Sequence, residues 1–233
     1  MQRYYYFTPM ILLVTAAAVS ILLTYTAWRR RPAPGAISFA ILMSAVAEWS
    51  LTYAFELGSV ELHTKMIWAN ISFLGIVILP TAWVFFALKY TRRDLWLTPF
   101  KKALFAVIPL ITLFLVWTNG LHGLIWGNVG LNTSGYIPMR ISTHGVWYWV
   151  NTLYSYLLVL IGAILIIEAL TRSPHLYKGQ TAGLLIGVFI PWIGNALYNF
   201  GLSPFPNLDL TPFAFTLTGF SMAWSVFGFR LFD

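Results

Sequence analysis

The chain has no cysteine and few charged residues. Its 233 residues include 14 Lys or Arg and 7 Asp or Glu, and charged side chains make up 9% of the sequence. Without cysteine, disulfides and thiolate metal sites are excluded, and the redox compartment stays undecided. Soluble domains carry about 25% charged residues. The low charge and the mean hydropathy of +0.75 therefore predict an integral membrane protein.

Residues needed for several kinds of chemistry are also missing. The last apolar run, Pro212 to Phe229, contains no lysine that could form a retinal Schiff base. The four histidines are all expected in loops, and none belongs to a HExxH or other paired motif for metal or haem. We expect no catalytic residue, no metal and no cofactor, and hence no enzyme activity in this chain.

Seven apolar runs are long enough to be membrane spans. At a rise of 1.5 Å per residue, about 20 residues cross the roughly 30 Å hydrocarbon core. Barrel strands alternate in polarity and these runs do not, so we predict an all-α seven-transmembrane helix bundle forming a single domain, residues 1–233. The predicted spans are Phe7 to Trp28, Ile37 to Leu57, Met66 to Leu88, Ala103 to Thr118, Val146 to Leu170, Gly179 to Phe200 and Pro212 to Phe229.

Basic residues collect on one side of the predicted spans. Eleven of the 14 lie in the connections of one side, and only Arg3, Lys65 and Arg140 lie on the other. Lys and Arg are retained on the cytoplasmic side of membrane proteins, so the N-terminus is predicted outside and the C-terminus in the cytoplasm. The basic connections then act as topology signals that contact lipid, and no nucleic-acid partner is expected.

The longest connection is predicted to form a β-hairpin. It runs from Asn119 to Gly145 and has two short extended segments on either side of the turn-like sequence NTSG at Asn132 to Gly135. Turn residues between two extended runs are typical of a hairpin. In the predicted topology the hairpin lies over the outer mouth of the bundle.

The sixth predicted span has two halves of different character. Gly179, Gly183 and Gly187 recur every fourth residue, which allows close helix packing, more readily within the bundle than between two copies. A homodimer is nevertheless left open. Beyond Pro191, Asn195 and Asn199 lie one turn apart, so this half is polar. We expect Pro191 to kink the helix between the two halves.

Glu48 and Thr52 form an intramembrane polar pair in the second span. A carboxylate at the centre of a span costs about 2.5–3.5 kcal/mol on insertion scales. No Lys or Arg is expected at the same depth, so Glu48 should be protonated or hydrogen-bonded to Ser, Thr, Tyr or Asn of neighbouring helices. A structural clamp between helices and a proton-sensing or ligand-sensing role both stay open.

Aromatic and amide side chains gather at the predicted outer ends of the spans. Glu56 lies about 12 Å above Glu48 along the helix. A crevice lined by aromatic rings with a few polar groups suits a small amphipathic or aromatic ligand. The competing explanation for the aromatic residues is the interfacial belt of membrane proteins. The predicted ligand-binding residues are Tyr53, Glu56, Trp68, Asn70, Trp147, Asn151, Tyr154, Trp192, Asn195, Tyr198, Asn199 and Asp209.

An ordered set of short segments supports a family resemblance. The segments include Trp68 to Gly75 (WANISFLG) before Pro80, Thr118 to His122 (TNGLH), Pro191 to Tyr198 (PWIGNALY) and Asp209 to Pro212 (DLTP). Together they resemble the seven-transmembrane N-terminal sensor region of bacterial and archaeal histidine kinases, which some diguanylate cyclases also carry. The resemblance covers nearly the whole chain.

This resemblance implies a receptor in the inner membrane of a bacterium or archaeon. In that family a cytoplasmic kinase or cyclase output domain follows the last span, and the parent is a protein-histidine kinase. Because the chain stops at Asp233, we expect it to be the sensor module alone. Its expected partners are a small-molecule ligand of unknown identity, the lipid bilayer and that output domain.

Two further functions stay open from the sequence. A small-solute transporter of 3+1+3 helix organisation is the main alternative, because prolines interrupt the third and sixth spans at Pro80 and Pro191. Local kinks also explain these prolines. A membrane anchor without a ligand is the other alternative.

Overall fold

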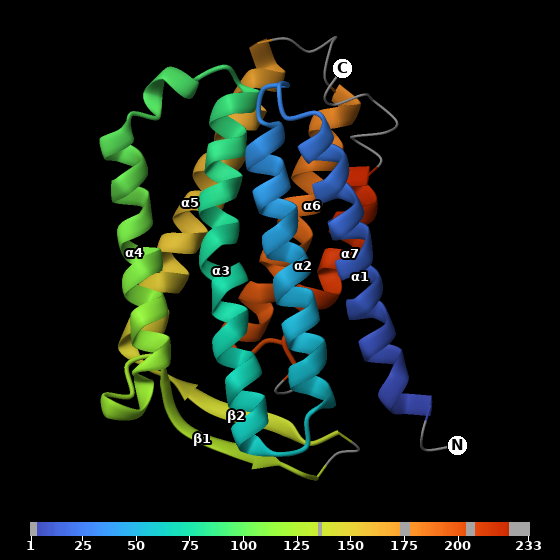
Figure 1. Cartoon of the computed structure of the whole chain (residues 1–233), viewed down its shortest axis with the longest axis vertical. Helices are drawn as coiled ribbons and strands as arrows, with labels where there is room; N and C mark the ends of the chain where they lie inside the picture. The colour runs from blue at the N-terminus through green and yellow to red at the C-terminus, as the bar shows by residue number, and fades with distance from the viewer. Residues whose placement is uncertain (1–3, 135–136, 173–177, 204–207, 224–233) are drawn as a thin grey trace.

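The structure is a computed structural model that describes residues 4–134, 137–172, 178–203 and 208–223. Within these residues the chain forms a helical bundle with a small two-stranded sheet at one end (Figure 1). The helices are α1 (Tyr4–Arg29), α2 (Ala36–Gly58), α3 (Leu62–Tyr90), α4 (Pro99–Trp117), α5 (Val146–Arg172), α6 (Lys178–Asn199) and α7 (Thr211–Ala223), with short 3-10 turns at Asp94–Trp96 and Asn119–Leu121.

The first six predicted spans coincide with α1 to α6, with boundaries that differ by at most a few residues, and the seventh begins within one residue of the start of α7. The largest shifts at a helix start are in α3, which begins at Leu62 and not at Met66, and in α4, which begins at Pro99 and not at Ala103. Thr98 caps this helix by accepting a hydrogen bond from the Lys101 N–H at 3.4 Å, and proline is favoured at the first helical position.

Six of the helices are long and apolar enough to cross a membrane. They are α1 to α6 (α1 from Pro9 on), so a multi-pass membrane protein is supported. The described part of α7 has 13 residues. The remainder of the predicted seventh span, up to Phe229, lies outside the described residues, and seven spans therefore stay a prediction.

The contacts between helices connect α1, α2, α3, α5, α6 and α7 in a ring. α4 lies at the edge of the bundle (Figure 1). α2 packs against α1, α3 and α7, while α6 packs against α5 and α7. α5 closes the ring on the other side by contacting α3 and α6. Among the long helices, α4 packs substantially against α3 and α5 alone. Most of its surface therefore faces outward.

The connections alternate between the two ends of the bundle (Figure 1). The hairpin shares its end with the α2–α3 and α6–α7 connections, and the opposite end holds the α1–α2 and α3–α4 connections. Arg29 to Arg31, Arg92 and Arg93 thus lie opposite the hairpin, whereas Lys65 and Arg140 lie at the hairpin end. This separation of charge is what the predicted orientation requires.

The predicted hairpin is present. Strands β1 (Trp126–Asn132) and β2 (Met139–His144) are antiparallel, with Asn132 opposite Met139 and Trp126 opposite His144. The base of β1 is held by Asn119, whose Oδ1 accepts from the backbone N–H of Trp126 at 3.0 Å and whose Nδ2 donates to the Trp126 carbonyl at 2.9 Å. These bonds hold the hairpin over one end of the helix ring.

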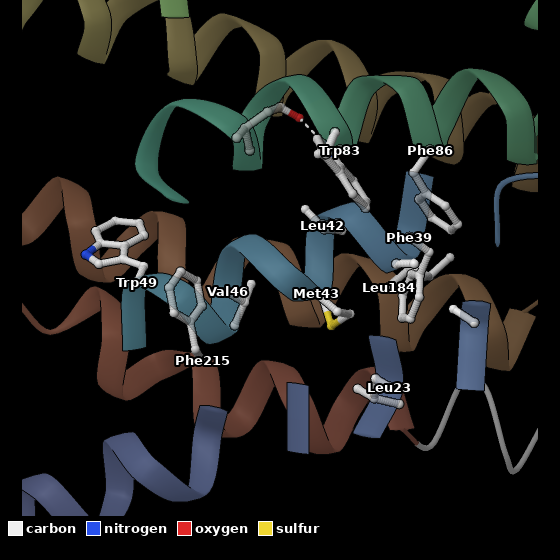
Figure 2. Close-up of a cluster of buried hydrophobic side chains, with 14 of the residues drawn as sticks. Leu23, Phe39, Leu42, Met43, Val46, Trp49, Trp83, Phe86, Leu184 and Phe215 are labelled. Carbon is white, nitrogen blue, oxygen red and sulfur yellow. Dashed lines mark hydrogen bonds between the residues drawn. The ribbon is translucent and has the colours of Figure 1, made fainter. Parts of the chain in front are cut away.

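The core consists mainly of buried side chains of α1, α2 and α3, joined by a few from α5, α6 and α7. Trp83 is fully buried, and its Nε1 donates to the Val159 carbonyl at 3.1 Å. Gly162 admits this ring, because a Cβ there would overlap Trp83. Figure 2 shows Trp49 beside Phe215, with ring centroids 5.2 Å apart. Aromatic packing therefore joins helices that are distant in the sequence.

The glycines of α6 pack against α7. Gly183 and Gly187 are buried. The Thr218 hydroxyl donates to the Gly187 carbonyl at 2.7 Å, and the Ser221 hydroxyl donates to the Gly183 carbonyl at 2.6 Å. The two described glycines therefore serve packing within the bundle, as predicted, while the surroundings of Gly179 lie outside the described side chains.

Candidate functional site

A cavity lies within the helix ring and extends toward the hairpin end. It is lined by residues of α2, α3, α5, α6 and α7, of both strands and of the segment before α7. The space in it that is open to the centres of water molecules is about 150 Å³. Cavities of this order bind molecules of the size of benzene. The fold therefore provides room for a small organic ligand.

Aromatic rings form much of the cavity wall. Trp49 packs on Phe215 from α7, and Trp192 of α6 packs edge-on against Tyr156 of α5, with ring centroids 5.6 Å apart. Tyr53 contributes a further ring from α2. Such rings offer large apolar contact area in a fixed geometry.

The two amides of α6 belong to a hydrogen-bond network with α5. Asn199 accepts from the Tyr148 hydroxyl at 2.6 Å and donates to Asn195 Oδ1 at 2.8 Å. The Tyr156 hydroxyl donates to Asn195 Oδ1 at 2.9 Å and accepts from Asn199 Nδ2 at 3.1 Å. All four residues line the cavity. The network holds this polar wall in one arrangement.

A buried ion pair stands at the hairpin end of the cavity. Arg140 Nε lies 2.8 Å from Glu56 Oε1, and their side chains are 11% and 7% exposed. The guanidinium also lies 4.4 Å from the centre of the Trp126 ring. Burial alone would lower the pKa of Arg140, but the neighbouring Glu56 raises it above the usual value, so Arg140 stays charged.

Lys65 is a second buried cation in the cavity wall. Its side chain is 1% exposed, and Nζ donates to the backbone carbonyl of Glu56 at 2.7 Å. That carbonyl belongs to the last turn of α2, whose partial negative charge favours a cation. Lys65 therefore caps α2 and also borders the cavity.

Asp209 is the second acidic group of the cavity. Its Oδ1 accepts from the Thr211 N–H at 2.9 Å and from the Thr211 hydroxyl at 2.6 Å, at the start of α7. Its own backbone N–H donates to the Tyr53 hydroxyl at 3.0 Å. Burial raises the pKa of Asp209 to about 6. The carboxyl group thus gains a proton under mildly acidic conditions.

His144 lines the cavity as a neutral ring. It stacks face to face on Tyr148, with centroids 3.8 Å apart and planes 4° from parallel. Burial, together with the charge of Arg140, lowers the pKa of His144 to about 4. The imidazole therefore adds no charge to the site at neutral pH.

Two buried polar groups in the cavity wall have no partner among the described residues. They are Trp192 Nε1 and Ser155 Oγ. A buried polar group without a hydrogen bond costs about 1–3 kcal/mol. Both groups are therefore positioned to bond with a molecule that occupies the cavity.

The structure brings together eight of the twelve residues predicted to contact a ligand. Four others lie away from the cavity: Trp68 packs on Phe55 at 4.7 Å, Asn70 accepts from Trp126 Nε1, Trp147 donates to Thr112 and Tyr154 donates to the Phe105 carbonyl. The eight that line the cavity are Tyr53, Glu56, Asn151, Trp192, Asn195, Tyr198, Asn199 and Asp209.

Several cavity residues were not predicted. Lys65, Arg140 and His144 border its charged end, and Tyr148 and Tyr156 belong to its polar network. Lys65 and Arg140 entered the sequence argument only through their place in the charge count. They are two of the three basic residues on the side of the bundle that carries few basic residues. Their unusual position was the one feature of the sequence that could have marked them as site residues.

The intramembrane pair lies outside the cavity. Glu48 Oε2 accepts from the backbone N–H of Gly75 in α3 at 2.8 Å, so its described partner is backbone and not the predicted side chain. Gly75 permits this approach, because a Cβ there would collide with Glu48. Thr52 donates to the Glu48 carbonyl within α2 at 2.8 Å. Glu48 thus joins α2 to α3, as a clamp would.

The histidines and acidic residues do not converge on a metal site. Within the described part of the chain, no group of three or more His, Asp or Glu is arranged to hold a metal ion. The sequence prediction put all four histidines in loops, but His63 lies in the first turn of α3 and His144 ends β2. The cavity instead presents aromatic rings and hydrogen-bonding groups.

Comparison with known proteins gives the chain its family. Among curated proteins, none matches it. Residues 12–233 match the family described as the N-terminal 7TM region of histidine kinase. The match covers almost all of the 233 residues and confirms the resemblance seen in the sequence. The chain therefore belongs to the family of N-terminal 7TM regions of histidine kinases.

Proposed function

We propose that this chain is the ligand-sensing receptor module of a two-component sensor histidine kinase. The observation that carries the proposal is the cavity, in which aromatic walls surround buried donor groups that lack a partner, Trp192 Nε1 among them. Family membership supports a sensor role and fits a chain without catalysis of its own. Nothing in the described residues favours the transporter alternative.

The charge distribution supports a ligand that arrives from outside the cell. Basic residues lie mainly at the end opposite the hairpin, which the positive-inside rule assigns to the cytoplasm. The cavity then faces outward below the hairpin. The protein would reside in the inner membrane of a bacterium or archaeon, with its C-terminus in the cytoplasm.

The packing of α7 supports a route from the ligand to an output domain. Thr211 and Phe215 of α7 line the cavity. Farther along, Ser221 bonds to the Gly183 carbonyl of α6. A ligand that binds one position of α7 better than another shifts this packing, and the shift would pass to a cytoplasmic kinase or cyclase domain.

Ligand binding is tested by filling the cavity. Val188 lines it from α6, and Ile186, two residues earlier, is 51% exposed on the outer surface. We expect amphipathic aromatic compounds to raise the melting temperature of the wild type and of Ile186→Phe, but not of Val188→Phe. A ligand at 100 times its Kd stabilises by about 2.7 kcal/mol.

The screen uses the protein in lipid nanodiscs. The receptor proposal is wrong if no compound in a broad library shifts the wild type. It is also wrong if every compound that does so acts equally on Val188→Phe, because binding then occurs outside the cavity.

A further inference from the structure

We infer that the cavity binds an amphipathic carboxylic acid, with the carboxylate beside Lys65 and the apolar body along Trp49 and Trp192. This inference rests on the proposed receptor function and adds the chemical class of the ligand. Its basis is a buried cation whose hydrogen-bonding capacity is only partly met, and which has no direct ion pair, among the described residues.

Not all of the N–H donors of Lys65 are hydrogen-bonded among the described residues. An ammonium group carries three N–H donors. Among the described residues, its one hydrogen bond goes to the Glu56 carbonyl at 2.7 Å. The side chain is 1% exposed and lines the cavity, so solvent outside the bundle cannot accept hydrogen bonds from the other two donors. A group inside the cavity can accept from them.

The carboxylates near Lys65 are bonded to other groups. The Glu56 carboxylate is held by Arg140 at 2.8 Å, and Asp209 Oδ1 is held by Thr211. Within the described residues, Lys65 forms no ion pair with either carboxylate. The end of α2 supplies a partial charge of roughly one half. A ligand carboxylate would give Lys65 a direct ionic partner.

Other chemical classes fit less well. An amine would bring positive charge toward both Lys65 and Arg140. The second group without a partner, Trp192 Nε1, donates and cannot accept, so it too requires an acceptor on the ligand. His144 is neutral, and Asp209 loses charge as the pH falls toward about 6. A ligand with a carboxylate at one end and a hydrogen-bond acceptor farther along would match Lys65 and Trp192.

The body of the ligand has an apolar place to lie. Trp192 precedes Asn199 by seven residues, which puts it about 10 Å farther from the hairpin end along α6. Trp49 and Phe215 pack together in the cavity wall at 5.2 Å. A chain or ring that reaches from the charged end toward Trp192 buries its apolar surface against these rings.

The inference is tested with phenylbutyrate and its uncharged amide, phenylbutyramide. Both are titrated against the protein in nanodiscs by isothermal calorimetry. We expect the acid to bind the wild type more tightly than the amide. Lys65→Met should weaken the acid by about tenfold to a hundredfold, the range for a charged hydrogen bond, and leave the amide unchanged.

Matched variants separate binding from folding. Lys89→Met removes the same charge in the last turn of α3, at the other end of the bundle, and should bind both compounds as the wild type does. Lys65→Arg keeps the charge and should retain part of the preference for the acid. The melting temperature of each variant without ligand shows that it is folded.

Three results would overturn the inference. They are equal affinity of the wild type for each acid and its amide, undiminished acid binding by Lys65→Met, and no binding of either phenylbutyrate or decanoate to the wild type. If neutral compounds still bind the wild type but not Val188→Phe, the receptor proposal stands and the carboxylate is wrong. If the library screen also gives no ligand, both are wrong.

The same contact can serve an acid from water or from the bilayer. Decanoate and decanamide partition into the membrane, whereas phenylbutyrate remains largely in solution. Tighter, Lys65-dependent binding of decanoate supports a lipid-derived acid, and tighter binding of phenylbutyrate supports a water-borne one. Both results support the carboxylate class.

Discussion

Arg140 and Glu56 form a buried ion pair that joins β2 to the last turns of α2, with Nε and Oε1 2.8 Å apart. The two residues are 84 positions apart in the sequence. Because Arg140 also packs over Trp126 in β1, the pair holds both strands of the hairpin over the cavity. The hairpin is therefore fastened to the helix whose end Lys65 caps.

Breaking this pair should destabilise the protein strongly. Arg140→Met leaves the Glu56 carboxylate buried without its partner, and such changes cost about 3–5 kcal/mol of unfolding free energy. The double variant Arg140→Met with Glu56→Gln should recover much of that loss, because it buries no lone charge. Chemical unfolding in detergent measures both. Additive losses in the double variant would contradict the coupling of the pair.

Gly75→Ala should separate α2 from α3. A Cβ at this position would lie 2.6 Å from the Ala45 carbonyl and would collide with the carboxylate of Glu48. Overpacking of this kind costs about 1–3 kcal/mol. Gly120→Ala is the matched control, because a Cβ there has no neighbour within 4 Å. Equal melting temperatures for the two variants would disprove the close approach at Gly75.

His144 and Asp209 should give opposite pH dependences. The pKa of His144 falls from 6.5 to about 4, so between these values the unfolded chain binds the proton and stability rises with pH. The pKa of Asp209 rises from 3.8 to about 6, so the folded chain binds the proton there and stability falls as pH rises.

Single variants separate the two contributions. His144→Phe leaves Asp209, and its unfolding free energy should fall as the pH rises from about 4 to 6. Asp209→Asn leaves His144, and its unfolding free energy should fall as the pH drops from 6.5 toward 4. Unfolding at a series of pH values measures the slopes. Slopes of the same sign in both variants would show that these groups do not govern the dependence.

Ser221→Ala should uncouple signalling from binding. Ser221 donates to the Gly183 carbonyl at 2.6 Å and does not line the cavity. We expect the full-length receptor carrying this change to bind ligand with unchanged affinity but to show an altered kinase response. Leu217→Ala, at a residue 56% exposed on α7, is the control. Autophosphorylation with and without ligand is the measurement, and an unchanged response in Ser221→Ala argues against this route.

Helix rotation explains why the sequence located some site residues and missed others. Successive residues of an α-helix are turned by about 100°, so positions two apart point to nearly opposite sides. Tyr154 was predicted to face the ligand, yet it donates to the Phe105 carbonyl of α4. Tyr156, two residues later, joins the cavity network with Asn195. The apolar runs of α5 do not reveal which side faces inward, because lipid and core are both apolar.

The positions of the six long helices α1 to α6 followed from the sequence, since a bilayer requires long apolar runs with internally paired backbones. The hairpin followed from its turn, and the packing of α6 from its glycines. The tertiary structure alone decided that Lys65 and Arg140 meet Glu56 at one end of a cavity. These residues lie on separate elements, and only the packing of α2, α3 and the hairpin determines the distances between their charges.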